Sequence, residues 1–308
     1  MDVGYDQPLF ILPFDHRASF EKDLFGFKPP LTADQTATVA ESKAVVFEGF
    51  RLALAKGAPR AAAGILVDEE FGADLLRAAK TEGVITCAPV EKSGQAEFQF
   101  EYGDAWREHI AAFEPTFVKV LVRYNPEGDA EMNARQAGRL RDLSDFVHGA
   151  SLRLMFELLV PMTSAQGDRV EGDQGLYDRQ LRPGLMVGAI QALQDAGVEP
   201  DIWKVEGLSS PDAYAAVVAA ARRGGRGRVG CIVLGRGSDE AGIIDWLRAA
   251  APVPGFIGFA VGRTTFWDAL VALRDKTITR DAAAERIAAR YLEWIDIFET
   301  ARMAAGQA

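Results

Sequence analysis

The chain has 308 residues, of which 48% are hydrophobic and 25% are charged, so its composition is that of an ordinary globular protein and argues against a disordered chain. Its formal net charge of −10 disfavours a general nucleic-acid binder, because neutralising a phosphate backbone requires a basic surface. No stretch approaches the roughly 20 apolar residues of a membrane span, and the amino terminus lacks the pattern of a signal peptide. We therefore expect a cytoplasmic enzyme with no nucleic-acid or membrane partner.

Eight short apolar runs are predicted to form strands. Several of them are almost continuously hydrophobic, which is typical of parallel strands that are covered on both faces. The predicted strands are residues 9–15, 63–69, 84–90, 117–124, 152–160, 202–207, 230–235 and 255–262.

Most of the segments between these strands are predicted to be helices. Thr32 and Gln35 form a capping-box pattern at the start of one helix. Ser210, which precedes a proline, marks the start of another, and Gly197 is a typical stop signal. The longest irregular stretch, residues 161–183, is interpreted either as a lid over an active site or as a surface loop. The predicted helices are residues 32–56, 102–113, 130–147, 184–196, 210–223, 239–250, 265–274 and, at the carboxyl end, 280–304.

The order of these elements predicts the fold class. Strands that alternate with helices indicate βαβ units and a parallel sheet. Eight such units in 308 residues favour a single-domain α/β protein, a (β/α)8 TIM barrel over residues 1–308, rather than an open doubly wound sheet. The open sheet stays as the alternative, although the first strand is not followed by the Gly-x-Gly-x-x-Gly turn of a dinucleotide-binding fold.

Ionisable residues occupy three neighbouring predicted strands. Because successive side chains of a strand alternate between its faces, Lys119 and Arg123 share one face of the fourth strand. In the same way, Lys204 and Glu206 share one face of the sixth, and Glu157 alternates with apolar neighbours in the fifth. An unpaired buried charge is costly, so a barrel interior holds such residues for a reason. We predict that all five point into the barrel and converge; a structural ion pair is the alternative for any one of them.

Lys204 and Glu157, on adjacent predicted strands, are the candidate catalytic pair. A lysine near other cations loses its proton more readily, and the neutral amine adds to a ketone to give an iminium. A neighbouring carboxyl group can move the protons that this chemistry requires. The pair predicts a class I aldolase, a carbon–carbon lyase with no cofactor other than the covalent lysine iminium.

The ends of the last two predicted strands carry a second signal. Gly235-Arg236 ends the seventh strand, and Gly262-Arg263 ends the eighth and opens a helix. Glycine lets backbone N–H groups approach an anion, and a helix amino terminus favours negative charge. The loops after strands seven and eight are the usual phosphate site of a barrel, and an arginine adds a bidentate partner. We predict a phosphate site here, with a simple turn beside a surface charge as the alternative.

A divalent metal site is the main competing interpretation. The chain has three histidines, and His109 and His148 lie in predicted helices, away from the strand ends. No ligand pair at metal spacing occurs. We therefore expect a site without metal. The residues that would otherwise supply ligands are Asp15, His16, Asp68, Glu69, Glu70 and His148.

Five segments of the chain resemble one known family, the tagatose-1,6-bisphosphate aldolase superfamily of class I barrels. The similarity is greater to the 5-dehydro-2-deoxyphosphogluconate aldolase-like domain of myo-inositol catabolism proteins. The resemblance runs over nearly the whole chain, and its most specific piece is the Asp-x-x-Lys-Val-Glu run. The segments are Phe14-Asp15-His16-Arg17, Val118-Lys119-Val120-Leu121, Phe156-Glu157-Leu158, Asp201-Ile202-Trp203-Lys204-Val205-Glu206 and Gly262-Arg263-Thr264-Thr265-Phe266-Trp267.

The resemblance implies roles for individual residues. Lys204 is the Schiff-base lysine and Glu157 the acid/base, while Asp15 and Lys119 orient the substrate. The two arginine loops hold its phosphate. We also expect other residues near the strand ends to contact the substrate. The substrate-binding candidates are His16, Arg17, Arg123, Glu206, Gly235, Arg236, Gly262 and Arg263.

The implied substrate is 5-dehydro-2-deoxygluconate 6-phosphate, cleaved to dihydroxyacetone phosphate and malonate semialdehyde. His16 stands where the tagatose-bisphosphate enzymes tend to have glutamine, and Arg123 adds an inward cation that suits a carboxylate or sulfonate at the far end of the substrate. The alternatives are an aldolase for tagatose 1,6-bisphosphate or a sulfo-sugar phosphate, and a non-catalytic barrel that binds a sugar phosphate. Related barrels often associate through their helical shell, so a homo-oligomer is a further expectation.

Overall fold

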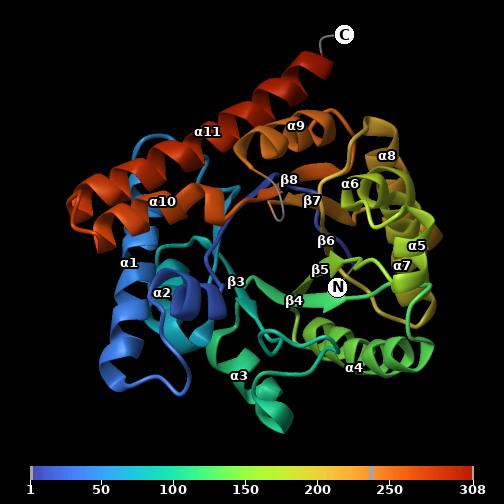
Figure 1. Ribbon diagram of the computed structural model, residues 1–308, viewed down its shortest axis with the longest axis horizontal. Coiled ribbons are helices and arrows are strands. Elements are labelled where there is room, and N and C mark those ends of the chain that lie inside the picture. Colours follow the sequence, from blue (N-terminus) through green and yellow to red (C-terminus); the bar gives the residue numbers. More distant parts are fainter. Residues whose placement is uncertain (1–2, 236–238, 307–308) are drawn as a thin grey trace.

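The computed structural model describes residues 3–235 and 239–306, and its strands close into a barrel (Figure 1). Each strand pairs in parallel with the next along the chain, and β8 pairs back onto β1. This confirms the predicted (β/α)8 TIM barrel and excludes the open doubly wound sheet. The strands are β1 (Leu9–Pro13), β2 (Ala63–Leu66), β3 (Ile85–Pro89), β4 (Phe117–Arg123), β5 (Arg153–Leu159), β6 (Ile202–Val205), β7 (Gly230–Leu234) and β8 (Phe256–Ala260).

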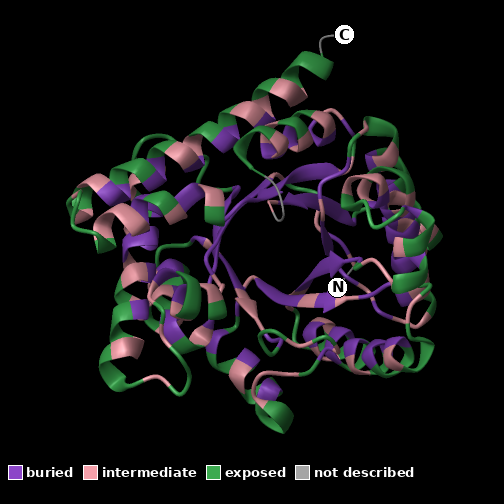
Figure 2. Ribbon diagram, viewed as in Figure 1, coloured by how far each residue is buried: buried purple, intermediate pink, exposed green. Residues whose placement is uncertain are grey.

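The strands are buried on both of their faces (Figure 2). The larger apolar core lies between the strands and the helices that surround them, and a smaller apolar cluster fills one end of the barrel interior. That cluster includes Phe117, Met155 and Ile202. Lys119 and Lys204 lie two residues further along β4 and β6, on the same side of their strands. The apolar layer is therefore the floor on which the ionisable residues stand.

Helices cover the outside of the barrel (Figure 1). The capping box predicted for Thr32 and Gln35 is present at the start of the first helix. Ser210 accepts a hydrogen bond from the N–H of Ala213, and Gly197 has a positive φ directly after a helix end, as predicted. The helices are α1 (Ala33–Ala55), α2 (Glu69–Thr81), α3 (Trp106–Phe113), α4 (Ala130–Gly149), α5 (Ser164–Arg169), α6 (Gln174–Leu176), α7 (Arg182–Asp195), α8 (Pro211–Ala221), α9 (Glu240–Ala250), α10 (Arg263–Arg274) and α11 (Arg280–Gly306), with the shorter turns η1 (Ser19–Leu24), η2 (Gly103–Ala105), η3 (Tyr177–Leu181) and η4 (Arg223–Gly225).

Two predicted segments differ from the structure. Helix α2 occupies a stretch for which the sequence analysis predicted no helix, and Asp68 caps it by accepting a hydrogen bond from the N–H of Phe71 at 2.9 Å. Residues 161–183, predicted to be irregular, contain α5, α6 and η3. They fold because Thr163 and Gln166 form a capping box and because the hydroxyl of buried Tyr177 donates to the carbonyl of Val160. A lid role for this segment stays a prediction.

The last helix, α11, ends two residues beyond the predicted boundary and packs against α1, α9 and α10. Two of its buried aromatic residues also make hydrogen bonds to other elements. The hydroxyl of Tyr291 donates to the carbonyl of Phe10 in β1 at 2.6 Å. The indole N–H of Trp294 donates to Thr265 in α10 at 3.1 Å. Helix α11 therefore ties together the first and last units of the barrel.

Among the helices of the described residues, none is both long enough and apolar enough to cross a bilayer.

The contact between β1 and β8 gives a stability prediction. A Cβ atom added to Gly258 would lie 1.8 Å from the backbone oxygen of Leu9, its partner on β1. Gly258→Ala should therefore displace strand backbone and destabilise the fold by about 1–3 kcal/mol or more. Urea denaturation followed by circular dichroism measures the change.

Gly138→Ala is the matched control. Gly138 is exposed in α4, and a Cβ there would meet no atom within 4 Å. Because alanine is a better helix former, this variant should be more stable by about 0.5–1 kcal/mol. Equal stability of the two variants would contradict the proposed steric clash at the β1–β8 contact.

Candidate active site

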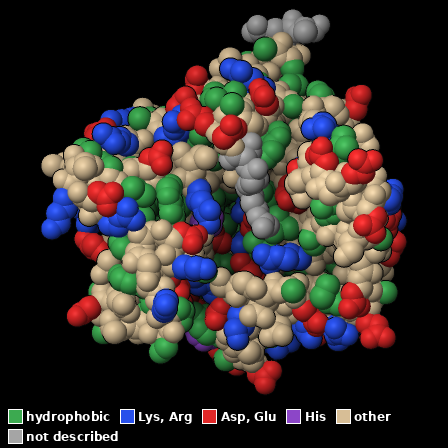
Figure 3. All heavy atoms as spheres, in the orientation of Figure 1, with side chains coloured by type: hydrophobic (Ala, Val, Ile, Leu, Met, Phe, Trp, Pro, Cys, Tyr) green, Lys and Arg blue, Asp and Glu red, His purple; other side chains and the backbone are tan. Residues whose placement is uncertain are grey.

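A cavity of about 780 Å³ opens at the carboxyl ends of the strands. It appears as a hollow at the centre of the face in Figure 3, with Lys and Arg side chains around it. In a barrel enzyme this is the face where active sites form. Most of the candidate residues predicted from sequence line it, together with a loop after β3. The candidates on the lining are Asp15, His16, Arg17, Lys119, Arg123, Glu157, Lys204, Gly235, Gly262 and Arg263.

Lys204 and Glu157 meet inside this cavity. They are direct partners in the register of β5 and β6, so their side chains leave the sheet side by side. Lys204 Nζ lies 2.9 Å from Glu157 Oε2, and both residues are more than nine-tenths buried. The contact brings a potential nucleophile within direct proton-transfer distance of a potential general base.

Lys119 lies at the centre of a carboxylate cage. Its Nζ atom is 2.6 Å from Glu91 Oε1, 2.9 Å from Asp15 Oδ2 and 3.1 Å from Glu157 Oε2. An ammonium group has three N–H donors, so three carboxyl groups are sufficient to use all of them. The cage residues, Lys119, Asp15, Glu91 and Glu157, form one network with Lys204.

The charges of the cage residues perturb one another. Burial opposes charge on the Lys119 amine, but the carboxylates of Asp15, Glu91 and Glu157 prevail and hold its pKa well above the usual range. Burial also opposes ionisation of Asp15 and Glu157, but the ammonium groups of Lys119 and Lys204 prevail and lower the pKa of both carboxyls. Burial raises the pKa of Glu91 in spite of Lys119. Glu157 is therefore available as a base.

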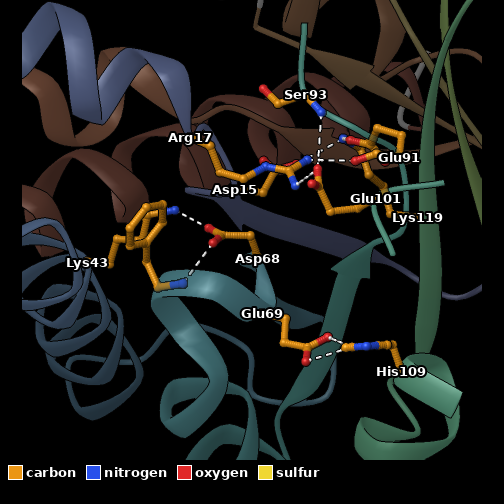
Figure 4. A network of polar contacts seen from close by, with 11 residues as sticks. Asp15, Arg17, Lys43, Asp68, Glu69, Glu91, Ser93, Glu101, His109 and Lys119 are labelled. Carbon is orange, nitrogen blue, oxygen red and sulfur yellow. Dashed lines mark hydrogen bonds and ion pairs between the residues drawn. The ribbon is translucent and has the colours of Figure 1, made fainter. Parts of the chain in front are cut away.

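Glu91 and Glu101 are the members of this site that the sequence analysis missed. Arg17 joins them: its guanidinium contacts the carboxylate of Glu101 and donates to the backbone oxygen of Glu91 at 2.6 Å (Figure 4). A signal was present, because Glu91 follows a predicted strand directly, as Asp15 ends another. The pairing of Glu91 with Phe100 across the loop is not visible in the sequence pattern.

His16 lies on the cavity wall with an edge-to-face contact to Phe266. Its Nδ1 atom is buried and has no hydrogen-bond partner among the described residues. Burial disfavours the imidazolium, and Lys204 and Arg263 add to this effect against the opposing pull of Asp15. Together they lower the pKa of His16 to about 4. His16 is therefore neutral at pH 7.

The described residues of the two predicted phosphate loops, Gly235 after β7 and Gly262-Arg263 after β8, line the cavity. Gly262 precedes α10, and a Cβ there would lie 2.4 Å from the backbone oxygen of Pro13, so this position requires glycine. Arg263 begins α10, is about half exposed, and contacts Ser19 and Asp23. Gly235 lies on the same lining, next to Val261 at the end of the neighbouring strand β8. Arg236 lies outside the described residues.

Two of the predicted inward residues, Glu206 and Arg123, have partners outside the cage. Strand β6 ends at Val205, so strand alternation no longer fixes the direction of Glu206. Its carboxylate accepts the N–H of Val160 at 3.0 Å and pairs with Arg182 at 3.3 Å, which places it away from Lys204. Arg123 lines the cavity and donates to the backbone oxygen of Gln95 at 2.7 Å. Contacts of either residue with a substrate stay predictions.

The acidic and histidine residues considered as metal ligands are separated in space. Asp68 pairs with the buried Lys43 of α1, and Glu69 pairs with His109 at 2.8 Å, as Figure 4 shows. His148 pairs with Asp201 at 3.0 Å. Within the described part of the chain, no group of three or more His, Cys, Asp or Glu side chains is arranged to hold a metal ion. The expectation of a metal-free reaction stays a prediction.

Fold and site together define a (β/α)8 barrel with a lysine–carboxylate centre at the carboxyl ends of its strands. The chain belongs to the family described as "Uncharacterized protein conserved in bacteria (DUF2090)", whose model matches residues 4–302. No curated protein matches it in sequence.

Solved structures of proteins from two different organisms share this fold. Cgl0159 from Corynebacterium glutamicum has a TM-score of 0.58 at 17% identity, with 94% of this chain and 88% of that chain covered. A fructose-bisphosphate aldolase from Slackia heliotrinireducens DSM 20476 has a TM-score of 0.54 at 14% identity, with 92% and 86% covered. At these identities the likeness shows the barrel fold alone.

The lowered pKa of His16 predicts a pH dependence of stability. Between its usual pKa of 6.5 and about 4, the unfolded chain binds a proton at His16 that the folded protein does not. The wild type should therefore lose about 1–3 kcal/mol of stability relative to His16→Gln as the pH falls through this window. Urea unfolding of both proteins at several pH values between 4 and 8 measures the difference. A difference that stays constant over that range would show that His16 titrates normally.

Proposed function

We propose that this protein is a class I aldolase in which Lys204 forms the iminium and Glu157 transfers the protons. The observation that carries the proposal is the 2.9 Å contact between Lys204 Nζ and Glu157 Oε2 within the cavity at the catalytic face of the barrel. The ammonium group of Lys119 is 3.1 Å from the same oxygen, so it favours the ionised, proton-accepting form of Glu157.

The proposed reaction begins when the neutral amine of Lys204 adds to the ketone carbon of the substrate. Glu157, having taken the proton of the lysine, returns it to the carbinolamine hydroxyl, and water leaves to form the iminium. Glu157 then accepts the proton of the hydroxyl on the far carbon of the bond that breaks, which is the carbon that becomes the aldehyde. The electrons of that carbon–carbon bond move to the iminium and give an enamine, and an aldehyde is released. Protonation of the enamine and hydrolysis of the resulting iminium free the second product and Lys204.

The proposed substrate is 5-dehydro-2-deoxygluconate 6-phosphate, which would give dihydroxyacetone phosphate and malonate semialdehyde. The proposed phosphate position is at Gly262 and Arg263, beside the amino terminus of α10. Arg123 lines the cavity from β4, which stands opposite β8 in the ring of strands, and would face the carboxylate end. The neighbour named as a fructose-bisphosphate aldolase supports the same reaction class.

Covalent trapping with dihydroxyacetone phosphate and borohydride tests the iminium. We expect a reduced adduct on Lys204, located by peptide mass spectrometry, and its complete loss in Lys204→Ala. Lys92→Ala is the matched control, because Lys92 also lines the cavity but is exposed and makes no contact with Glu157 among the described ion pairs. The reduced adduct on Lys204 should persist in Lys92→Ala. A folded wild type that is stabilised thermally by the compound but forms no adduct would favour a non-catalytic sugar-phosphate-binding barrel.

Replacing the proposed acid/base tests its role in turnover. Glu157→Gln keeps the size of the side chain but cannot accept the lysine proton, so kcat should fall about 10²–10⁴-fold, the usual contribution of a positioned acid/base. The cleavage rate of 5-dehydro-2-deoxygluconate 6-phosphate is measured by coupling the release of dihydroxyacetone phosphate to its reduction. Glu69→Gln, a carboxylate paired with His109 outside the cavity lining, serves as the control. Retention of the wild-type kcat in Glu157→Gln would rule out the role.

A further inference from the structure

Glu91 is a buried carboxyl on the cavity lining that the proposed mechanism does not use. It is 8% exposed, it lies directly beyond β3, and its Oε1 atom makes the shortest of the three contacts to Lys119, at 2.6 Å. Its Oε2 atom is buried and has no hydrogen-bond partner among the described residues. The side chain therefore interacts with the site through Lys119.

The backbone of Glu91 is held from two sides, so its side chain has a fixed origin. Arg17 donates to its carbonyl oxygen at 2.6 Å and also contacts Glu101. Across the loop, Glu91 pairs with Phe100 in an antiparallel bridge, and the N–H of Glu101 donates to the carbonyl of Val90 at 2.9 Å. These contacts fix the base of the loop after β3, and the carboxyl group of Glu91 points toward Lys119 in β4.

The two lysines of the cavity have different surroundings. Lys119 is 1% exposed and has three carboxyl groups within 3.1 Å of its Nζ atom. It donates hydrogen bonds to Asp15 and Glu91 and forms an ion pair with Glu157. For Lys204, the ion pair found within the described part of the chain is the one with Glu157, at 2.9 Å. A buried amine with three carboxyl groups close by is stabilised in its charged form. Lys204 has one such group, Glu157, which it shares with Lys119.

We propose that Glu91 is a positioning residue that completes the cage around Lys119 and keeps that lysine protonated, so that Lys204, and not Lys119, acts as the nucleophile. The choice of Lys204 as the nucleophile rests on the proposed aldolase function, whereas the protonation state of Lys119 does not. Lys119 then acts as a fixed positive charge that orients Asp15 and Glu157. Without Glu91, one N–H donor of Lys119 has no acceptor and the negative charge around it decreases.

The experiment is trace reductive methylation of the protein with formaldehyde and cyanoborohydride at pH 9, followed by peptide mass spectrometry. Only a neutral amine reacts, so for one lysine compared between variants of equal accessibility the rate follows its neutral fraction. At a pH below the pKa of the lysine, this fraction rises tenfold for each unit by which the pKa falls. We expect methylation of Lys119 to rise about tenfold or more in Glu91→Ala relative to wild type. A tenfold rise corresponds to a fall of one unit in the pKa of Lys119, which is a modest effect when a charged partner of a buried ion is removed. The exposed Lys276 in the same samples serves as the internal reference.

Two further variants make the result decisive. Glu91→Gln is isosteric and protects against a failure of Glu91→Ala to fold; it keeps an acceptor but loses the charge, so Lys119 methylation should rise by a smaller factor. Glu97→Ala is the control, since Glu97 belongs to the same loop but pairs with Arg135 and Arg139 instead of Lys119. Its Lys119 methylation should equal that of wild type. Unchanged methylation of Lys119 in both Glu91 variants, with native circular dichroism, would overturn the proposal.

The methylation result is independent of the aldolase test. A wild type that forms no borohydride adduct with dihydroxyacetone phosphate removes the proposed function but leaves the state of Lys119 to be decided by the methylation rates. An adduct on Lys204 together with unchanged methylation in the Glu91 variants keeps the aldolase and removes the role of Glu91.

Discussion

The ammonium group of Lys119 is the interaction on which the polar half of the barrel interior depends. A buried carboxylate is costly unless a positive charge or hydrogen bonds compensate it. The ammonium group of Lys119 compensates the negative charge of three carboxylates, Asp15 after β1, Glu91 after β3 and Glu157 in β5. These carboxylates in turn compensate the positive charge of Lys119. The apolar layer below, which includes Phe117 and Met155, gives this cluster a rigid floor and keeps water from reaching it from the other end of the barrel. The reacting groups thus sit in a fixed electrostatic setting before any substrate enters.

Much of the fold could be predicted from the sequence because the signals were local. Continuous apolar runs mark strands that are covered on both faces, and the caps at Thr32 and Ser210 mark helix starts. Helix α2 was missed because its first residues, Asp68 and Glu69, were interpreted as the end of a strand. The short helices after β5 were missed although Thr163 and Gln166 carry a local capping-box pattern. Part of their stability comes from the contact of Tyr177 with Val160, which no local pattern shows.

The site was predictable to the extent that strand alternation applies. Lys119, Glu157 and Lys204 lie within strands, so their common direction followed from the sequence. Glu206 lies one residue beyond β6, where the alternation no longer holds, and it contacts Arg182 instead. Glu91 lies beyond β3 in a loop, and its approach to Lys119 depends on a clamp by Arg17 that joins segments far apart in the chain. Residues that follow a strand therefore need the tertiary structure before their roles can be assigned.

The pairing of β1 with β8 has a consequence for how the chain is made. All other pairs of adjacent strands in the barrel are also consecutive along the chain. The second edge of β1, in contrast, is covered only once β8 has been synthesised. During translation the growing sheet therefore exposes two edges, which are the usual starting points of aggregation. Helix α11 emerges after all eight strands and packs over this seam through Tyr291 and Trp294. Both edges stay unpaired until the seam is closed, and after closure the barrel has no open edge.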